Sequence, residues 1–402
     1  MTTRTTSAPL DGNRDRDRLH AVIDRFARCR VAVIGDFVAD EFVYGRVARI
    51  SREAPVLILE YDKTDTVPGG AGNAANNVAA LGAKTRAVGL LGDDATGDRL
   101  RAALLTGVDA RALARVRGRE TPTKTRILAG GIHSAKQQIV RMDRGTHRRA
   151  SADERRRFEQ AAIAATASID GVLVSDYGGG LVTPRLVAAI KRSARTPKGG
   201  RPPILVDSRY DLARYRGLTA STPNEAEAEA LIGEPIGDDV RALERAGRRL
   251  LEDTQMAAVL ITRGSRGMAL FEPDTPTRHI PIHGSDEIAD VTGAGDTVIA
   301  TMTLALAAGA SPFEAAQLAN VAGGIVVMKR GTATASAEEL RAALVAWNRD
   351  GWDESRSAAP RGQGATRKNI GDIRPRSNAA PGDAPPGNHP RNQGSRGPRG
   401  RK

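Results

Sequence analysis

The segment Asp290-Val-Thr-Gly-Ala-Gly-Asp296 combines glycines and carboxylates at the start of a predicted helix over about 293–308. The first N–H groups of a helix have no partner inside the helix, so a helix start attracts anions. The small residues 293–295 would let a phosphate approach these N–H groups closely. Asp296 would then stand beside that phosphate, where a carboxylate can take the proton from an attacking hydroxyl. The alternative is an ordinary glycine-rich turn whose aspartate interacts only with the helix dipole.

A second glycine-rich segment, Gly69-Gly-Ala-Gly-Asn73, precedes a helix of small residues predicted over 74–81. Glycines let a substrate lie against the main chain, and an asparagine amide both donates to and accepts from sugar hydroxyls. Asp36 and Asp40 follow the first predicted strand, 31–36, at the end where open α/β sheets bind their ligands. These two carboxylates can accept hydrogen bonds from two sugar hydroxyls. A simple helix start and two solvated turn residues are the alternatives.

Other loops also follow predicted strands. Asn224-Glu-Ala-Glu227 begins a helix directly after Thr222-Pro223, and it has the pattern of a helix capping box as well. The turns 176–180 and 262–267 are rich in glycine and indicate no specific ligand by themselves. The histidines show no spacing typical of metal ligands, and the single cysteine, Cys29, excludes an intrachain disulfide framework.

The elements that must position these loops alternate regularly from residue 151 onward, which predicts a mostly parallel sheet covered by helices on both faces. Two earlier strand pairs, 42–47 with 56–61 and 123–128 with 137–142, do not fit the alternation and indicate a small additional sheet or lid. The other predicted strands are 31–36, 85–90, 171–175, 204–207, 218–222 and 257–262, followed by a hairpin through Phe271. The predicted helices are 16–28, 74–81, 95–106, 151–168, 183–194, 224–232, 237–253, 293–308, 312–328 and 336–347.

The length of 402 residues allows one large α/β domain, which we place at 30–350 after an N-terminal extension and helix over 1–29. No segment approaches the ~18 uninterrupted apolar residues of a membrane helix. The segment Met1–Asp17 is polar and lacks the apolar core of a signal peptide. We therefore expect a cytoplasmic enzyme.

The formal net charge of +13 is concentrated near the C-terminus, because residues 355–402 contain eleven Arg or Lys and two Asp or Glu. This part is rich in Gly, Pro, Asn and Arg and has almost no aliphatic side chains, so it cannot bury enough surface to fold. We predict a disordered basic tail over 351–402. Weak contact of this tail with nucleic acid is the alternative to a purely solvated segment.

Removal of the tail should leave the enzyme intact. A chain that ends at Asp353 is expected to keep its thermal stability and its kinetic constants, because the tail composition cannot support packing. Thermal unfolding and steady-state kinetics of the shortened and full-length chains check this. A large loss of Tm or kcat on truncation would show that the tail docks onto the domain.

The order of these loops resembles the PfkB, or ribokinase-like, carbohydrate kinase family between about Arg30 and Trp347. The shared pattern is Gly-Asp with a second Asp, Gly-Gly-x-x-Asn, Asn-x-x-Glu, Thr-Arg-Gly-x-x-Gly and Asp-x-Thr-Gly-Ala-Gly-Asp. Within the family, residues 44–56, 68–73 and 290–298 look most like the kinases of D-glycero-D-manno-heptose 7-phosphate. The resemblance implies a ribokinase-like three-layer αβα sandwich with a β-sheet lid that often forms a dimer contact. It also implies ATP-dependent phosphorylation of a sugar hydroxyl.

The resemblance also implies roles for individual residues. The catalytic base would be Asp296, and the anion hole would comprise Gly293, Ala294 and Gly295. The sugar site would comprise Asp36, Asp40, Gly69, Gly70 and Asn73. Mg²⁺ and phosphate would be held, largely through water, by Asn224 and Glu227. The nucleotide site would comprise Thr262, Gly264, Gly267 and Asn320, together with the Mg²⁺ motif. A monovalent cation such as K⁺ would bind near Asp290 and Thr292.

Two positions depart from the heptose kinase pattern. Those relatives usually have Ser-Asp-Tyr-Gly-Lys-Gly, whereas Ser175-Asp-Tyr-Gly-Gly-Gly180 places Gly179 at the lysine position. They also tend to have Asp-Pro-Lys where this chain has Asp207-Ser-Arg209. By motif position, Arg209 and Arg49 are the candidates to supply the missing positive charge. The residues after Trp347 are too few and too polar for the adenylyltransferase domain of the bifunctional relatives, and the chain contains no His-x-Gly-His motif.

We therefore expect transfer of the ATP γ-phosphoryl group, with the 1-OH of D-glycero-D-manno-heptose 7-phosphate as the acceptor. A kinase of another sugar or of a nucleoside is one alternative. A catalytically silent binding protein whose basic tail contacts nucleic acid is the other.

Overall fold

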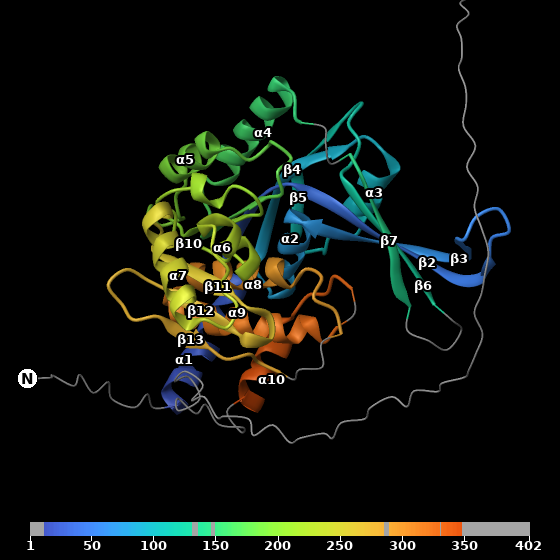
Figure 1. The fold of residues 1–402 in the computed structure, drawn as a ribbon. Helices are drawn as coiled ribbons and strands as arrows, with labels where there is room; N and C mark the ends of the chain where they lie inside the picture. Colours follow the sequence, from blue (N-terminus) through green and yellow to red (C-terminus); the bar gives the residue numbers. More distant parts are fainter. Residues whose placement is uncertain (1–11, 131–135, 146–148, 285–288, 330, 348–402) are drawn as a thin grey trace, which may run out of the picture. The chain divides into compact units, whose positions relative to one another are not determined.

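The computed structural model describes residues 12–130, 136–145, 149–284, 289–329 and 331–347 (Figure 1). The predicted basic tail and residues 1–11 of the N-terminal extension lie outside the described residues. The helices are α1 (Gly12–Arg25), α2 (Ala71–Ala80), α3 (Ala95–Ala102), α4 (Ala152–Ala165), α5 (Pro184–Ser193), α6 (Glu225–Ile232), α7 (Val240–Thr254), α8 (Ala294–Ala307), α9 (Pro312–Val327) and α10 (Ala337–Trp347). None of these helices is long and apolar enough to cross a membrane.

The larger of two sheets has nine strands in the order β13-β12-β11-β10-β9-β8-β1-β4-β5. All neighbours from β11 to β5 are parallel, and β12 and β13 join the edge in antiparallel pairs. This confirms the mostly parallel sheet. Its strands are β1 (Arg30–Gly35), β4 (Lys84–Gly92), β5 (Val108–Val116), β8 (Gly171–Asp176), β9 (Ile204–Ser208), β10 (Ala220–Ser221), β11 (Ala258–Thr262), β12 (Met268–Phe271) and β13 (Arg278–Ile280).

Successive residues of the buried strands point to opposite sides of the sheet. Both sides of β1 are apolar, and helices cover both faces. In β1, Val31 and Val33 pack into one hydrophobic cluster with α1, α2, α3, α8, α9 and α10. The alternate residues Ala32 and Ile34 pack into another cluster with α4 and α5, while α6 and α7 cover β11 and β12. The α1 side chains of Leu19, Val22 and Ile23 are buried in the first cluster, so this helix packs as part of the domain core.

The smaller sheet has four strands in the order β3-β2-β6-β7, and it projects from one side of the body (Figure 1). Its strands are β2 (Phe37–Ile50), β3 (Leu57–Gly70), β6 (Thr123–Gly130) and β7 (Gln137–Arg144). The predicted strand pairs therefore form the expected additional sheet. However, β2 and β3 have 14 residues each and are far longer than the predicted 42–47 and 56–61. The two strands are longer because they pair with each other in antiparallel register from Phe37 opposite Gly70 to Ile50 opposite Leu57.

Strands β5 and β13 are absent from the predicted strands. In β5, charged residues such as Asp109 and Arg111 interrupt the apolar pattern, because this strand forms an edge of the large sheet. An edge strand needs less apolar surface than a central one, so its hydrophobic signal is weak.

Candidate active site

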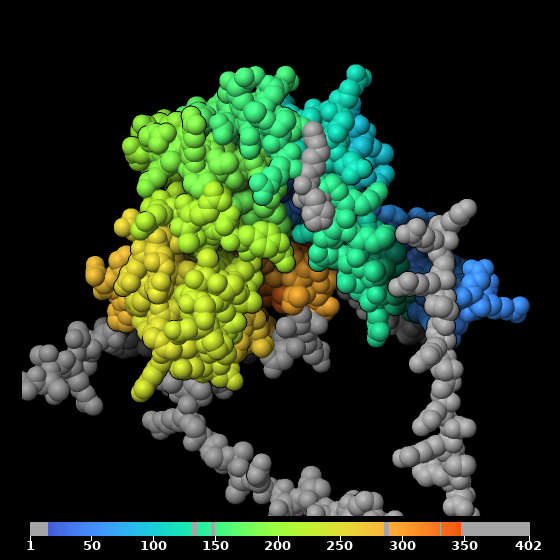
Figure 2. Space-filling view, turned by 45° about the horizontal axis from the view of Figure 1, so that its top comes forward, coloured from blue at the N-terminus to red at the C-terminus, as the bar shows by residue number. Residues whose placement is uncertain are grey.

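A cavity of about 310 Å³ lies at the carboxyl ends of the parallel strands, where α8 begins. It adjoins a second cavity of about 320 Å³, and Lys124, Arg141, Tyr177 and Arg209 line both. In the space-filling view, the surface is hollowed between the teal strands of the small sheet and the yellow-green part of the body (Figure 2). The first cavity is lined by Asp40, Gly70, Lys124, Arg126, Arg141, Tyr177, Asp207, Arg209, Thr222, Asn224, Glu227, Thr262, Val291, Thr292, Gly293, Gly295 and Asp296.

Asp296 lies in the first turn of α8, and its side chain is buried, with 6% of the residue exposed. Asn73 donates a hydrogen bond from Nδ2 to Asp296 Oδ2 at 2.8 Å, and the Tyr177 hydroxyl donates to Asp296 Oδ1 at 3.0 Å. Burial raises the pKa of Asp296 to about 6, although these two hydrogen bonds act in the opposite direction. The carboxylate is thus held in one orientation, and its pKa suits proton transfer near neutral pH.

The start of α8 offers unsatisfied N–H groups beside this carboxylate. Gly293 has a left-handed conformation with φ of 80°, and a Cβ atom there would lie 2.5 Å from Asn73 Nδ2. Within the described part of the chain, the N–H groups of Gly295 and Asp296 donate to no acceptor. Of the three residues in the expected anion hole, Ala294 differs, because its N–H already donates to the Val291 carbonyl at 3.2 Å. The remaining N–H groups can stabilise an anion at the helix start.

Three of the predicted sugar-site residues line the cavities, and the other two, Gly69 and Asn73, contact Asp40 and Asp296. Asp40 lines the first cavity and accepts a hydrogen bond at 2.5 Å from Arg126, while Gly70 lies beside it. A Cβ atom at Gly69 would lie 2.1 Å from Asp40 Oδ2, so a larger residue there would displace this carboxylate. Asp36 lines the second cavity. The expected sugar ligand Asn73 instead uses its amide to hold Asp296.

Asn224 and Glu227 form both halves of a capping box at the start of α6, with hydrogen bonds of 2.9 and 3.0 Å. Both also line the cavity, so the capping role and a ligand-binding role are compatible. Asp207, at the end of β9, faces the same space, and burial together with repulsion from Asp296 and Glu227 raises its pKa to about 8. The buried Thr222 hydroxyl next to them has no partner among the described residues.

The carboxylates of Asp207 and Glu227 line this cavity, and such oxygen donors suit Mg²⁺, since a divalent cation would relieve their mutual repulsion. Nevertheless, no three His, Cys, Asp or Glu side chains within the described ranges are close enough to bind a metal ion together. The oxygen donors therefore fit an ion that keeps several of its water ligands, as Mg²⁺ usually does.

Of the predicted nucleotide residues, Thr262 is among the described residues that line the cavity, whereas Gly264, Gly267 and Asn320 are not. Thr262 ends β11 and lines the cavity beside Asn224. Gly264 and Gly267 flank the next turn with positive φ angles of 56° and 75°. Asn320 on α9 is buried, and its amide donates to the Pro281 carbonyl at 2.8 Å.

The predicted cation-site residues Asp290 and Thr292 lie just before α8. The Asp290 carboxylate accepts hydrogen bonds from the N–H groups of Thr292 and Gly331 at 2.9 and 3.1 Å. It therefore ties the loop before α8 to the segment after α9.

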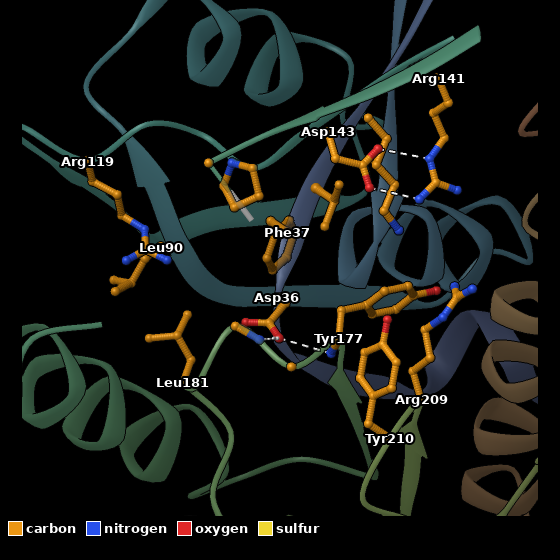
Figure 3. A pocket seen from close by; sticks show the side chains of 16 residues that line it. Asp36, Phe37, Leu90, Arg119, Arg141, Asp143, Tyr177, Leu181, Arg209 and Tyr210 are labelled. Atoms are coloured by element: carbon orange, nitrogen blue, oxygen red, sulfur yellow. Dashed lines mark hydrogen bonds and ion pairs between the residues drawn. The ribbon is translucent and has the colours of Figure 1, made fainter. Parts of the chain in front are cut away.

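A group of basic side chains extends from the first cavity into the second. Lys124, on β6, and Arg209, after β9, form no ion pair with any described carboxylate, and burial lowers the pKa of Lys124. Arg141 joins them at one side, whereas Arg119 lies at the opposite end of the second cavity (Figure 3). Arg49, on β2, lines neither cavity. Lys124 and Arg209 thus provide positive charge without an ion pair among the described residues, although Asp40 acts electrostatically on Lys124, and Arg209 on Asp207.

The structure also accounts for glycine at position 179. A Cβ atom at Gly179 would lie 2.5 Å from Asp36 Oδ1, and the Gly179 N–H donates to Asp36 Oδ2 at 3.0 Å. The Asp36 carboxylate therefore occupies the space that a larger residue at 179 would need. Positive charge in this part of the site comes from Lys124 on another strand.

Sequence reasoning did not identify Lys124, Arg141, Tyr177, Asp207 or Thr222 as site residues. Tyr177 and Asp207 lie in the segments compared with the heptose kinases, and their positions after β8 and β9 could have indicated them. Lys124 carries a weaker signal, because its place in the site depends on the parallel pairing of β6 with β2, which sets it opposite Asp40.

Comparison with known proteins adds a family match. Residues 30–340 match the family described as pfkB family carbohydrate kinase. The chain is 41% identical over 334 residues to the "Bifunctional protein HldE" of Desulfatibacillum aliphaticivorans, covering 82% of this chain and 66% of that protein. It is 40% identical over 332 residues to the protein of the same name in Geobacter sulfurreducens, again with 82% and 66% coverage. The chain thus spans just under two thirds of the length of these relatives.

Solved structures share the fold at lower identity. Arabidopsis thaliana ribokinase, determined with ribose and ATP, superposes with a TM-score of 0.61 at 20% identity, over 79% of this chain and 98% of that one. Escherichia coli phosphofructokinase-2, determined with potassium, gives a TM-score of 0.62 at 18% identity, with the same coverage. These similarities support the three-layer arrangement with the small sheet.

Proposed function

Because the chain belongs to the pfkB family of carbohydrate kinases, we propose that its cavity transfers the γ-phosphoryl group of ATP to a sugar hydroxyl. We further propose that the acceptor is the 1-OH of D-glycero-D-manno-heptose 7-phosphate. The observation that carries the reaction type is the buried Asp296, held by two hydrogen bonds beside the free N–H groups of a helix start. The heptose assignment rests on the sequence segments 44–56, 68–73 and 290–298 and on the unpaired cations of the cavity.

Several groups in and beside the cavity have roles in this reaction. Asp296 takes the proton from the sugar hydroxyl as the new bond forms between its oxygen and the γ-phosphorus. The bond from that phosphorus to the β–γ bridging oxygen breaks, and ADP leaves with the bond's electron pair. The N–H groups of Gly295 and Asp296 point to the place where negative charge develops on the transferred group. Asp40 and Asp36 accept hydrogen bonds from other sugar hydroxyls.

Asn224, Glu227 and Asp207 are the residues that would hold Mg²⁺, largely through water. The ion supplies positive charge that neutralises the phosphate oxygens during transfer. Thr262, Gly264, Gly267 and Asn320 would contact the nucleotide. A K⁺ site near Asp290 and Thr292 would add a fixed positive charge at the start of α8.

A screen of acceptors tests the proposed function. The full chain is incubated with ATP and Mg²⁺ against heptose 7-phosphate, the free heptose, ribose, fructose 6-phosphate and a nucleoside, and ADP release is measured. Heptose 7-phosphate should give the highest kcat/KM. Preference for another sugar or a nucleoside would support the proposed kinase activity and contradict the proposed acceptor. If no acceptor released ADP, the catalytically silent protein would be the correct interpretation.

We also propose that two copies of the chain associate through the small sheet. Large apolar side chains are exposed on its strands and on the β2–β3 turn, including Val47, Ile50, Val56, Leu57, Tyr61, Ile139, Val140 and Met142. So many exposed large apolar side chains on one small sheet favour a protein–protein contact. The β-sheet lid that the family resemblance implies as a dimer contact is the same surface.

Light scattering after size-exclusion chromatography should therefore give twice the chain mass. The substitutions Ile50→Arg and Tyr61→Arg, at residues with 65% and 67% exposure, should shift the protein to the monomer. Val345→Arg, at an exposed apolar residue of α10, is the matched control and should leave the dimer in place. A monomeric wild-type chain would contradict the proposal.

A further inference from the structure

The Tyr177 side chain reaches the reacting carboxylate, although Tyr177 is neither the base nor a ligand of the sugar or of Mg²⁺ in the proposed reaction. It follows β8 directly, and it lines both cavities. Its hydroxyl donates to Asp296 Oδ1 at 3.0 Å, while Asn73 holds Oδ2. Each oxygen of the carboxylate therefore accepts one hydrogen bond. The donors are distant in sequence, since Tyr177 is 119 residues and Asn73 is 223 residues from Asp296.

The loop that carries Tyr177 is itself held by two buried carboxylates. The N–H groups of Tyr177 and Gly179 donate to Asp36 Oδ2 at 2.9 and 3.0 Å (Figure 3). The N–H of Gly178, between them, donates to Asp176 Oδ1 at 3.0 Å. Three successive backbone donors are thus satisfied by side chains. This arrangement leaves the loop little freedom to withdraw the phenol ring from Asp296.

The ring is also fixed from the side of the small sheet. Lys124 Nζ lies 4.9 Å from the centroid of the Tyr177 ring, a typical cation–π distance. The hydroxyl remains a donor at neutral pH, because burial and the neighbouring Asp296 carboxylate raise the pKa of Tyr177 well above its usual value. A neutral phenol is therefore present to hold Asp296.

We propose that Tyr177 is a positioning residue, which holds the Asp296 carboxylate in the orientation that accepts the proton of the sugar hydroxyl. This inference rests on the proposed function of Asp296. A misplacement of reacting groups by about 1 Å can cost about 10²-fold in rate. Loss of the Tyr177 hydroxyl should therefore lower kcat strongly.

The hydrogen bond also affects when Asp296 is ionised. A donor to a carboxylate stabilises the charged form and lowers the pKa, so loss of the Tyr177 hydroxyl should raise the pKa of Asp296 from about 6. Asp296 acts as a base only when ionised, and activity is lost as the pH falls through this value. The charged or titratable groups that face Asp296 in the cavity or influence its charge are Asp40, Lys124, Arg126, Arg141, Asp207, Arg209 and Glu227.

The test is the pH profile of Tyr177→Phe, a change that keeps the ring over which Lys124 lies. In the full chain, kcat should fall about tenfold or more, while the KM for ATP stays near the wild-type value. The acid limb of the kcat profile should move to higher pH by about one unit. The position of this limb does not depend on the amount of folded enzyme, so partial loss of stability cannot produce the shift.

Tyr215→Phe is the matched control, because it removes a buried tyrosine hydroxyl that donates to another carboxylate, Asp176, at 2.6 Å. It should lower Tm and leave the acid limb in place. An unshifted limb in Tyr177→Phe, an equal shift in both variants, or failure of Tyr177→Phe to fold would overturn the inference. The proposed function would fail separately, through full activity of Asp296→Asn.

Discussion

Replacing Asp296 by asparagine should lower kcat by about 10²- to 10⁴-fold, the usual contribution of a general acid or base. An amide at this position can still accept a hydrogen bond from Asn73 or Tyr177 but cannot take a proton from the sugar hydroxyl. The affinity for ATP should stay close to that of the wild-type chain, because the base acts on the acceptor in the transition state. Steady-state kinetics and nucleotide binding measure the two effects separately.

Thermal unfolding of the same variant checks that it is folded. Burial raises the pKa of Asp296 from 3.8 to about 6, so the ionised carboxylate destabilises the folded state fully above about pH 6, and this cost declines as the pH falls from 6 toward 3.8. At pH 7.5, Asp296→Asn should therefore melt no lower than the wild-type chain. Asp98→Asn, at an exposed carboxylate of α3, is the matched control and should keep its activity. Near-normal turnover by Asp296→Asn would refute the assignment of the base.

Activity on heptose 7-phosphate should exceed activity on the free heptose by about 10- to 100-fold in kcat/KM, since a hydrogen bond to a charged group is worth about 1.5–3 kcal/mol. The cations expected to hold the distal phosphate are Lys124 and Arg209, which have no carboxylate partner among the described residues. Binding of this phosphate would also place the reacting 1-OH of the sugar next to Asp296. Comparison of both sugars under identical conditions measures the preference.

The variant Arg209→Ala should raise the KM for the phosphorylated sugar by about tenfold and change the constants for the free sugar little. Arg49→Ala is the matched control, because Arg49 is an exposed arginine of β2 that lines neither cavity. Equal kcat/KM for the two sugars in the wild-type chain would exclude the heptose 7-phosphate proposal and leave a general sugar kinase. An equal effect of both arginine substitutions would exclude a specific phosphate contact by Arg209.

Several features of the fold could be predicted because they depend on neighbouring residues. The alternation of strands and helices after residue 151 predicted the parallel sheet, since each buried strand and each amphipathic helix has its own local pattern. The small sheet was predicted from strands that did not fit this pattern. The extent of β2 and β3 could not be predicted, because their outer halves are exposed and are held by pairing with each other.

Local sequence was enough to place the parts of the site that lie within a few residues of each other. Asp296 stands in the first turn of α8 because the glycine-rich turn and the helix start are contiguous, and Asn224 with Glu227 forms the capping box of α6 for the same reason. In contrast, long-range packing brings Tyr177 and Asn73 to Asp296 and places Lys124 in the cavity beside Arg209. These contacts depend on the order of strands in two sheets, which is set by packing between distant segments and leaves no local sequence pattern.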